Sequence, residues 1–172
     1  MDVRINRRGA AARLVLGAAL ALALTGPGVA AAESAAAPDF ALASIAGSNY
    51  RLSEYRGEVV ALLFWASWCG DCRRELERFE RLRRTYGNVG FVVLGVSLDD
   101  EPAQARALAA AAALGYPVLS DPGKEVARTY RVDDLPLIVL IDRNGVVRAR
   151  HDALDEREER GLMVSLRDLI DE

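Results

Sequence analysis

The two cysteines of this 172-residue chain are separated by two residues, in the segment Trp68-Cys69-Gly70-Asp71-Cys72. They follow an apolar run at residues 59–65 and precede a charged segment with the pattern of a helix. At such a strand-to-helix junction, the unpaired N–H groups of the helix start favour a thiolate on Cys69. Cys72 would lie one turn further along, close enough to form a disulfide with Cys69. Two nearby cysteines can also be plain buried residues, but this position favours reversible dithiol chemistry.

Two elements must position these cysteines, and the hydrophobic pattern predicts both. The continuous apolar run Val59–Trp65 is typical of a central strand that is covered on both faces. Residues 71–86 have the pattern of a helix that ends at Gly87. Cys72 lies on the apolar side of this helix, so it is expected to face the core while Cys69 stays exposed. The other residues on that side are Leu76, Phe79, Leu82 and Tyr86.

Glu75 falls inside this apolar sector. Burial among apolar side chains should raise the pKa of Glu75, which suits proton exchange with the Cys72 thiol. The single histidine, His151, is far away in the chain. The opposite interpretation is that Glu75 turns to the edge of the sector and reaches solvent. The remaining charges of the helix are expected to form a solvated face with no functional role. They include Arg74 and Arg78 and the pairs Glu77–Arg81 and Glu80–Arg84.

The rest of the chain predicts an α/β domain. A short hairpin is expected around the turn Gly47-Ser48-Asn49, with Ser53 capping a single helical turn after it. Further strands are expected at Phe91–Val96, Val118–Ser120, Leu137–Ile141 and Val146–Arg150, and helices at Pro102–Leu114, Gly123–Tyr130 and from Leu154 onward. This order indicates a three-layer α/β sandwich, in which a mixed central sheet carries helices on both faces.

The first 32 residues have the order of a secretory signal peptide. Four arginines precede an uncharged apolar run at residues 14–24, which is followed by helix breakers and small residues. Cleavage is expected after about Ala31 or Ala32. The alternative is an uncleaved N-terminal anchor, because residues 14–32 carry no charge. No cysteine follows the apolar run, which argues against a lipid-anchored lipoprotein. The protein is therefore expected in the periplasm or at the outer face of the cytoplasmic membrane.

The remaining chain divides into a linker at residues 33–37 and a domain at residues 38–172. Without residues 1–32, the chain has 18 basic and 24 acidic residues. This acidic balance argues against nucleic-acid binding, which needs a basic face. Exported proteins usually carry several structural disulfides, whereas Cys69 and Cys72 are too close in sequence to stabilise a fold. Reactivity therefore explains the pair better than stabilisation does.

These motifs together resemble the TlpA/ResA-like branch of the thioredoxin superfamily, over residues 38–170. The shared features are Trp68-Cys69-x-x-Cys72 after a strand and Leu135-Pro136 before a later strand. The N-terminal hairpin, an inserted helix after Pro102 and the segment Leu140–Gly145 point to the exported branch. The resemblance implies a thioredoxin-like fold with an N-terminal hairpin extension and one inserted helix. It also implies that the protein is a thiol-disulfide oxidoreductase.

The resemblance assigns chemical roles to three residues. It implies that Cys69 attacks a substrate disulfide, that Cys72 resolves the mixed disulfide, and that Glu75 assists proton movement. The expected substrates are disulfides of other extracytoplasmic proteins, with apocytochrome c among the family's uses. A membrane electron-donor protein would keep the pair reduced. We expect a monomer with no metal and no cofactor besides the redox-active Cys69–Cys72 disulfide.

The resemblance also implies a substrate-binding surface beside the cysteines. The Leu135–Pro136 bond is expected to be cis, which would bring the backbone of Leu135 beside the disulfide. An extended substrate chain could then pair with that backbone. Trp68 is expected to shield one side of the cysteine pair, although it could instead belong to the core.

Three departures from the family pattern concern the redox potential more than the reaction type. Asp71 stands where the family commonly has proline, Glu77 where a helix-kinking proline is often found, and Leu63 where classical thioredoxins have a buried aspartate. Gly70 and Asp71 are therefore expected to tune the potential. A carboxylate at Asp71 opposes a neighbouring thiolate by on the order of 1 kcal/mol at an exposed helix end. This repulsion would make the protein a stronger reductant.

Other functions and metal sites fit parts of the pattern less well. A thiol peroxidase of the peroxiredoxin type would need Thr three residues before its cysteine and Pro seven before, where Ala66 and Leu62 stand. A copper-handling protein could use both cysteines as soft ligands, but His151 and Met163 have no evident ligand spacing. Zinc would need four ligands, which the chain does not obviously supply. A non-catalytic recognition module would have no reason to keep both cysteines.

Overall fold

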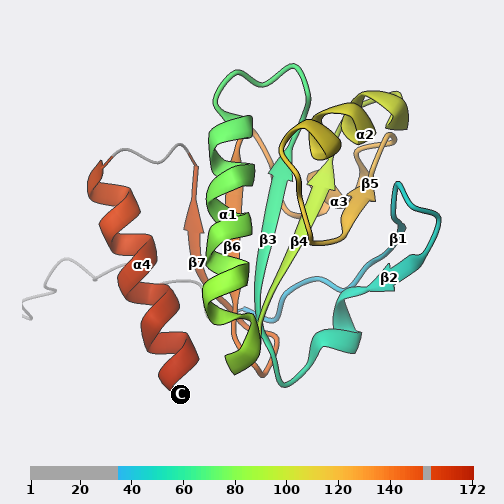
Figure 1. The fold of residues 1–172 in the computed structure, drawn as a ribbon. Coiled ribbons are helices and arrows are strands. Elements are labelled where there is room, and N and C mark those ends of the chain that lie inside the picture. The colour runs from blue at the N-terminus through green and yellow to red at the C-terminus, as the bar shows by residue number, and fades with distance from the viewer. Residues whose placement is uncertain (1–34, 153–155) are drawn as a thin grey trace, which may run out of the picture. The chain divides into compact units, whose positions relative to one another are not determined.

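The computed structural model describes residues 35–152 and 156–172. These residues form a mixed five-stranded sheet (Figure 1). Across the sheet its strands are β5 (Val118–Ser120), β4 (Phe91–Ser97), β3 (Val59–Trp65), β6 (Leu137–Ile141) and β7 (Val147–His151). The strands β3, β4 and β5 are parallel, and β6 and β7 run antiparallel to their neighbours. The carboxyl ends of β3 and β4 therefore lie at the same edge as the start of β6 and the end of β7.

The central strand β3 separates two hydrophobic cores. All seven of its residues are buried, as the continuous apolar run predicts. Because side chains alternate along a strand, Val59, Ala61, Leu63 and Trp65 enter one core and Val60, Leu62 and Phe64 the other. Burial on both faces makes β3 a rigid support for the segment that follows it.

The helices are divided unequally between the two faces. The first core contains residues of α1 (Cys72–Tyr86), α2 (Pro102–Ala111) and α4 (Glu156–Asp171), and Figure 1 shows α1 and α4 on the same side of the sheet. The second core contains residues of the short helices η1 (Leu52–Tyr55) and α3 (Glu125–Thr129). The hairpin of β1 (Ala41–Ala43) and β2 (Asn49–Arg51) lies beside β5, through a bridge between Ser44 and Leu119. The predicted three-layer sandwich with an N-terminal hairpin and an inserted helix is confirmed.

Several predicted element ends differ from the observed ones. The helix α1 ends at Tyr86 with Gly87 as its C-cap, as predicted, but Gly87 is not left-handed; a 3-10 turn, η2 (Gly87–Val89), follows, and the left-handed residue comes after it, at Gly90 with φ 85°. The helix α2 was expected to reach Leu114 but ends near Ala112, and Ala113 takes the left-handed conformation, with φ 50°. Ser53 does not cap η1; its N–H and hydroxyl both donate to Asp39.

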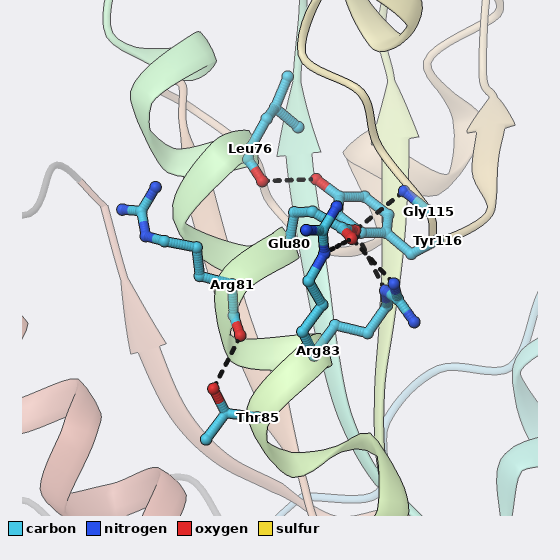
Figure 2. A network of polar contacts seen from close by, with 8 residues as sticks. Leu76, Glu80, Arg81, Arg83, Thr85, Gly115 and Tyr116 are labelled. Atoms are coloured by element: carbon cyan, nitrogen blue, oxygen red, sulfur yellow. Dashed lines mark hydrogen bonds and ion pairs between the residues drawn. The ribbon is translucent and has the colours of Figure 1, made fainter.

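A polar network fixes α1 against the loop between α2 and β5 (Figure 2). The carboxylate of Glu80 accepts hydrogen bonds from Arg83, from Arg84 and from the Gly115 N–H, which is 2.9 Å away. The hydroxyl of Tyr116 donates to the carbonyl of Leu76 at 3.2 Å. An added Cβ at position 115 would lie 2.7 Å from Nη2 of Arg83, so the arginine side chain would have to shift from its hydrogen bond to Glu80. Gly115 is therefore a place of close approach to this network rather than the end of the helix.

Glu80 was expected on the solvated face, and that expectation is wrong, because only 4% of the residue is exposed. The hydrogen bonds from Arg83 are the main reason why the pKa of Glu80 falls to about 2. The predicted ion pair of Glu80 with Arg84 is present at 2.8 Å, whereas Glu77 pairs with Arg73 at 2.9 Å. Within the described ranges, no helix is long and apolar enough to cross a membrane.

Candidate active site

The two cysteines form a disulfide that follows the carboxyl end of β3, with Cα atoms 5.4 Å apart. Cys72 is the first residue of α1 and is fully buried in the first core. Cys69 precedes the helix and is only half-buried. The structure therefore places an accessible sulfur and an inaccessible sulfur in one bond, as the helix pattern predicts.

A buried aspartate anchors the segment that leads to Cys69. Asp99 follows β4, and its carboxylate accepts hydrogen bonds from the N–H of Ser67 at 3.0 Å and from its hydroxyl at 2.6 Å. The hydroxyl of Ser97 also donates to Asp99, at 2.8 Å. Sequence reasoning missed this residue, although an aspartate directly after a buried parallel strand is a usable signal. The anchor fixes the backbone two residues before the disulfide.

The Leu135–Pro136 peptide bond is cis, as the resemblance implies. Phe64 of β3 pairs with Leu137 of β6, so Pro136 lies beside the end of β3, where the cysteine segment begins. Pro136 is buried and Leu135 is half-buried. The proline thus lies at the same edge of the sheet as the disulfide.

The residues next to Cys69 are exposed, and one of them, Trp68, is apolar. Trp68 is 69% exposed, so the interpretation that it belongs to the core is wrong. Gly70 is exposed, and nothing lies within 4 Å of a Cβ added there. The side chain of Asp71 is 74% exposed and lies 3.7 Å from Nη2 of Arg74. This segment is accessible to a second polypeptide.

Glu75 lies one helical turn after Cys72, and its side chain is only 4% exposed. The interpretation in which Glu75 reaches solvent is therefore wrong. Burial raises the pKa of Glu75, and the positive charges of Arg78 and Arg74 oppose that rise. Its Oε2 atom has no hydrogen-bond partner among the described residues. A carboxylate held in this way can accept and release a proton.

Arg78 and His151 are two further charged or titratable residues at this site. Arg78 was expected in solvent but is buried, and it lies between Glu75 and the α4 residue Glu159, at 3.6 and 3.1 Å. His151 is far along the chain, yet it pairs with Ile138 at the end of β7 and so reaches the same edge of the sheet. Burial lowers the pKa of His151, and Arg78 adds to the effect while Glu158 opposes it. Topology, not sequence distance, brings His151 here.

The described part of the chain contains no group of three or more His, Cys, Asp or Glu side chains placed to hold a metal ion. Cys69 and Cys72 are joined to each other. Ala66, at the position where a peroxiredoxin would need threonine, is fully buried. Nothing in this geometry favours the copper-handling or the peroxidase alternative.

A family model and two curated relatives match this chain. The model of the AhpC/TSA family matches residues 34–150. The thiol-disulfide oxidoreductase ResA of Geobacillus kaustophilus (strain HTA426) is 36% identical over 119 residues, which are 69% of this chain and 68% of that protein. The thioredoxin-like protein YneN of Bacillus subtilis (strain 168) is 34% identical over 121 residues, which are 69% of this chain and 71% of that protein.

Solved structures show the same fold. A Chlorobium tepidum protein named as a thiol:disulfide interchange protein DsbE superposes with a TM-score of 0.76 at 34% identity, over 80% of this chain and 97% of its own. The exposed lipoprotein thioredoxin Etrx1 of Streptococcus pneumoniae (strain TIGR4) gives a TM-score of 0.62 at 32% identity, over 77% of this chain and 100% of its own. The similarities in sequence and in structure thus lead to proteins named as thiol-disulfide oxidoreductases, thiol:disulfide interchange proteins or thioredoxins.

Proposed function

The chain belongs to the AhpC/TSA family and is a thiol-disulfide oxidoreductase of the ResA type, and on that premise we propose that it is exported and reduces disulfides of other extracytoplasmic proteins. The observation that carries this proposal is the pairing of a half-exposed Cys69 with a fully buried Cys72 at the start of α1. Such a pair admits a substrate to one sulfur only.

The first step is attack by the reduced Cys69 thiolate on a sulfur of the substrate disulfide. The S–S bond of the substrate breaks, a mixed disulfide forms with Cys69, and one substrate sulfur leaves as a thiolate. The position of Cys69 before the helix start stabilises its negative charge. Cys72 cannot compete for this step because its side chain is inaccessible.

The second step is attack by Cys72 on the Cys69 sulfur. The Cys72 thiol must first lose its proton, and Glu75 is the acceptor, since it is buried on the same side of α1 one turn later. The new Cys69–Cys72 bond forms as the second substrate sulfur leaves. Two electrons have then passed to the substrate, whose two thiolates take up protons from solvent.

The substrate docks on Trp68 and on the backbone before Pro136. An exposed indole next to Cys69 offers apolar contact area to a partner chain. The Leu135 backbone lies just before β6, beside the end of β3, and an extended segment could add main-chain hydrogen bonds there. Affinity from backbone and apolar contacts would let the enzyme act on several proteins, with apocytochrome c as one candidate.

Export follows from the N-terminal pattern of residues 1–32, which lie outside the described residues. The name of the pneumococcal neighbour, an exposed lipoprotein thioredoxin, supports a location outside the cytoplasm. In an oxidising compartment the Cys69–Cys72 pair would stay oxidised, so a membrane electron-donor protein must return two electrons to it. Sequencing the mature N-terminus distinguishes cleavage near Ala32 from an uncleaved anchor.

Trapping in intact cells tests the substrate class. A Cys72→Ser variant keeps the attacking thiol but cannot resolve the mixed disulfide, so covalent complexes should accumulate through Cys69. Dithiothreitol should reduce the mixed disulfides and separate the two proteins of each complex. The trapped partners should be cysteine-bearing proteins from outside the cytoplasm, including apocytochrome c where cells make it.

The matched control is a Cys69→Ser variant, which keeps only the buried thiol and should trap at least tenfold less. Equal trapping by both variants would reverse the assigned roles. Complexes that contain only cytoplasmic proteins would refute the extracytoplasmic substrate class.

A further inference from the structure

Two charged side chains, Arg78 of α1 and Glu159 of α4, connect α4 to the Glu75 carboxylate, one helical turn after Cys72. Nη1 of Arg78 lies 3.6 Å from Oε2 of Glu75, and Nη2 of Arg78 lies 3.1 Å from Oε1 of Glu159. The side chain of Arg78 is only 10% exposed, whereas that of Glu159 is 53% exposed. Arg78 thus lies between a buried acid and an acid at the surface.

Burial of the Arg78 guanidinium is unfavourable unless a negative charge stays close to it. A guanidinium group removed from water needs a nearby negative charge, and losing one partner of a buried pair leaves the other charge uncompensated. Oε2 of Glu75 and Nη2 of Arg78 are both buried without a well-aligned hydrogen bond among the described residues. The two groups therefore hold each other mainly by charge, at distances longer than a hydrogen bond, which leaves the Glu75 oxygen open to a proton.

We propose that Arg78 is a positioning residue for the dithiol reaction: held by Glu159 of α4, it keeps the Glu75 carboxylate in its buried place one helical turn after Cys72. The inference rests on the proposed role of Glu75 as proton acceptor for Cys72. It gives α4, a helix that contributes no cysteine, a direct electrostatic connection to the site.

The groups that face Glu75 act on it in opposite directions. On its own helix, Arg78 and Arg74 favour the ionised carboxylate, but Arg74 is 69% exposed and is screened by water. From α4, Glu159 disfavours the ionised form. Removing the positive charge of Arg78 should therefore raise the pKa of Glu75, and removing the negative charge of Glu159 should lower it.

The pKa of His151 also depends on the charge of Arg78. It is the single histidine of the chain, and its Nε2 atom is buried without a hydrogen-bond partner in the described ranges. Glu158 of α4 and the neighbouring Asp152 favour its charged form, while Arg78 disfavours it. Loss of the Arg78 charge should raise the pKa of the imidazole as well.

A carbon-13 NMR titration of the glutamate carboxyl groups in the full chain tests the inference. The oxidised protein is used, so that neither cysteine titrates, and the Glu75 signal is the one that disappears in Glu75→Gln. Arg78→Met should shift the Glu75 titration to higher pH, Glu159→Gln should shift it to lower pH, and Arg78→Lys should restore part of the wild-type position. The His151 ring protons should also titrate at higher pH in Arg78→Met.

Arg81→Met is the matched control, since Arg81 is an exposed arginine of the same helix. It should leave the Glu75 and His151 titrations unchanged. If Arg78→Met moves Glu75 no further than Arg81→Met does, the inference is wrong. Should Arg78→Met fail to fold, Arg78→Lys decides, because a lysine ammonium lacks the fork that reaches both Glu75 and Glu159, and an unchanged Glu75 signal there overturns the proposal.

Exchange kinetics separate this inference from the proposed function. If Glu75→Gln alters the pH profile of disulfide exchange while the Arg78 and Glu159 variants leave the Glu75 titration unchanged, only the role of Arg78 fails. If these variants shift the Glu75 titration while Glu75→Gln leaves exchange unaltered, Arg78 still positions Glu75, and proton transfer through Glu75 fails instead.

Discussion

Glu75 and Glu80 lie on the same helix, both are buried, and each is followed three residues later by an arginine, yet their surroundings differ. Glu80 accepts two hydrogen bonds from Arg83, one from Arg84 and one from the Gly115 N–H. Oε2 of Glu75 has no hydrogen-bond partner among the described residues, and the nearest guanidinium nitrogens lie 3.6 and 3.8 Å from its carboxylate.

The difference shows that burial alone does not decide what a carboxylate does. Hydrogen bonds to the ionised form bring the pKa of Glu80 down to about 2, with those from Arg83 as the main cause. Burial, which the charges of Arg78 and Arg74 only partly oppose, raises the pKa of Glu75. Glu80 therefore stays ionised and holds α1 against the loop before β5, whereas Glu75 can exchange a proton one helical turn after Cys72.

The largest expected effect is on stability. Glu80→Gln removes the charge that Arg83 and Arg84 share and should lower the free energy of unfolding at pH 7 by about 2 kcal/mol, since both arginines are partly exposed and screened. Urea denaturation measures this loss. An equal loss of stability in the matched variant Glu75→Gln would contradict the distinction between the two glutamates.

The pH dependence of stability should differ in sign between the two residues. The pKa of Glu80 is lowered from 4.5 to about 2, so its contribution is present above pH 4.5 and is lost as the pH falls toward 2. The pKa of Glu75 is raised, so its ionisation removes stability as the pH rises above 4.5.

Denaturation over a pH series measures both contributions. The difference in free energy of unfolding between Glu80→Gln and wild type should shrink as the pH falls below 4.5. Glu75→Gln should gain relative stability as the pH rises above 4.5. Two variants that follow parallel curves would mean that the two sites are electrostatically alike.

A smaller effect is expected at Asp71, a third acid near the start of the same helix. Its side chain is 74% exposed and lies near Arg74, so its repulsion of a Cys69 thiolate is screened. Asp71→Asn should lower the pKa of Cys69 and make the potential less negative by about 10 mV or less. Iodoacetamide labelling against pH and equilibration with glutathione measure the two quantities. A higher pKa of Cys69 in the variant would remove Asp71 from the redox-tuning residues.

The sheet could be predicted from the sequence because its strands are continuous apolar runs. Val59–Trp65 and Leu137–Ile141 are each buried along their whole length, and the predicted bounds match the observed ones. Helix ends were predicted less well, because glycine is a weak signal when another residue can take the left-handed conformation. Ala113 takes the left-handed conformation after α2, whereas Gly115 does not, and its N–H instead donates a hydrogen bond to Glu80.

The site could be predicted only as far as it is local in sequence. The burial of Cys72 and Glu75 follows from the helical pattern around them. The contacts of Arg78 with Glu159 and of Glu80 with the Gly115 N–H could not be deduced in this way, because these partners come from α4 and from the loop before β5. Both residues flank the apolar sector of α1, so long charged side chains there can be covered by whatever element packs next to the helix.

The most direct test of this account is the pH profile of disulfide exchange in wild type, Glu75→Gln and Glu80→Gln. Each rate is measured with one disulfide substrate and corrected for the folded fraction. Glu75→Gln should slow exchange at pH 7 by about 100-fold, the lower end of the range for a lost general base, and should change the shape of the profile. Glu80→Gln should follow the wild-type profile. A Glu75→Gln profile that superimposes on wild type, or an equal change in Glu80→Gln, would contradict the proposed division between a proton-transfer carboxylate and a structural one.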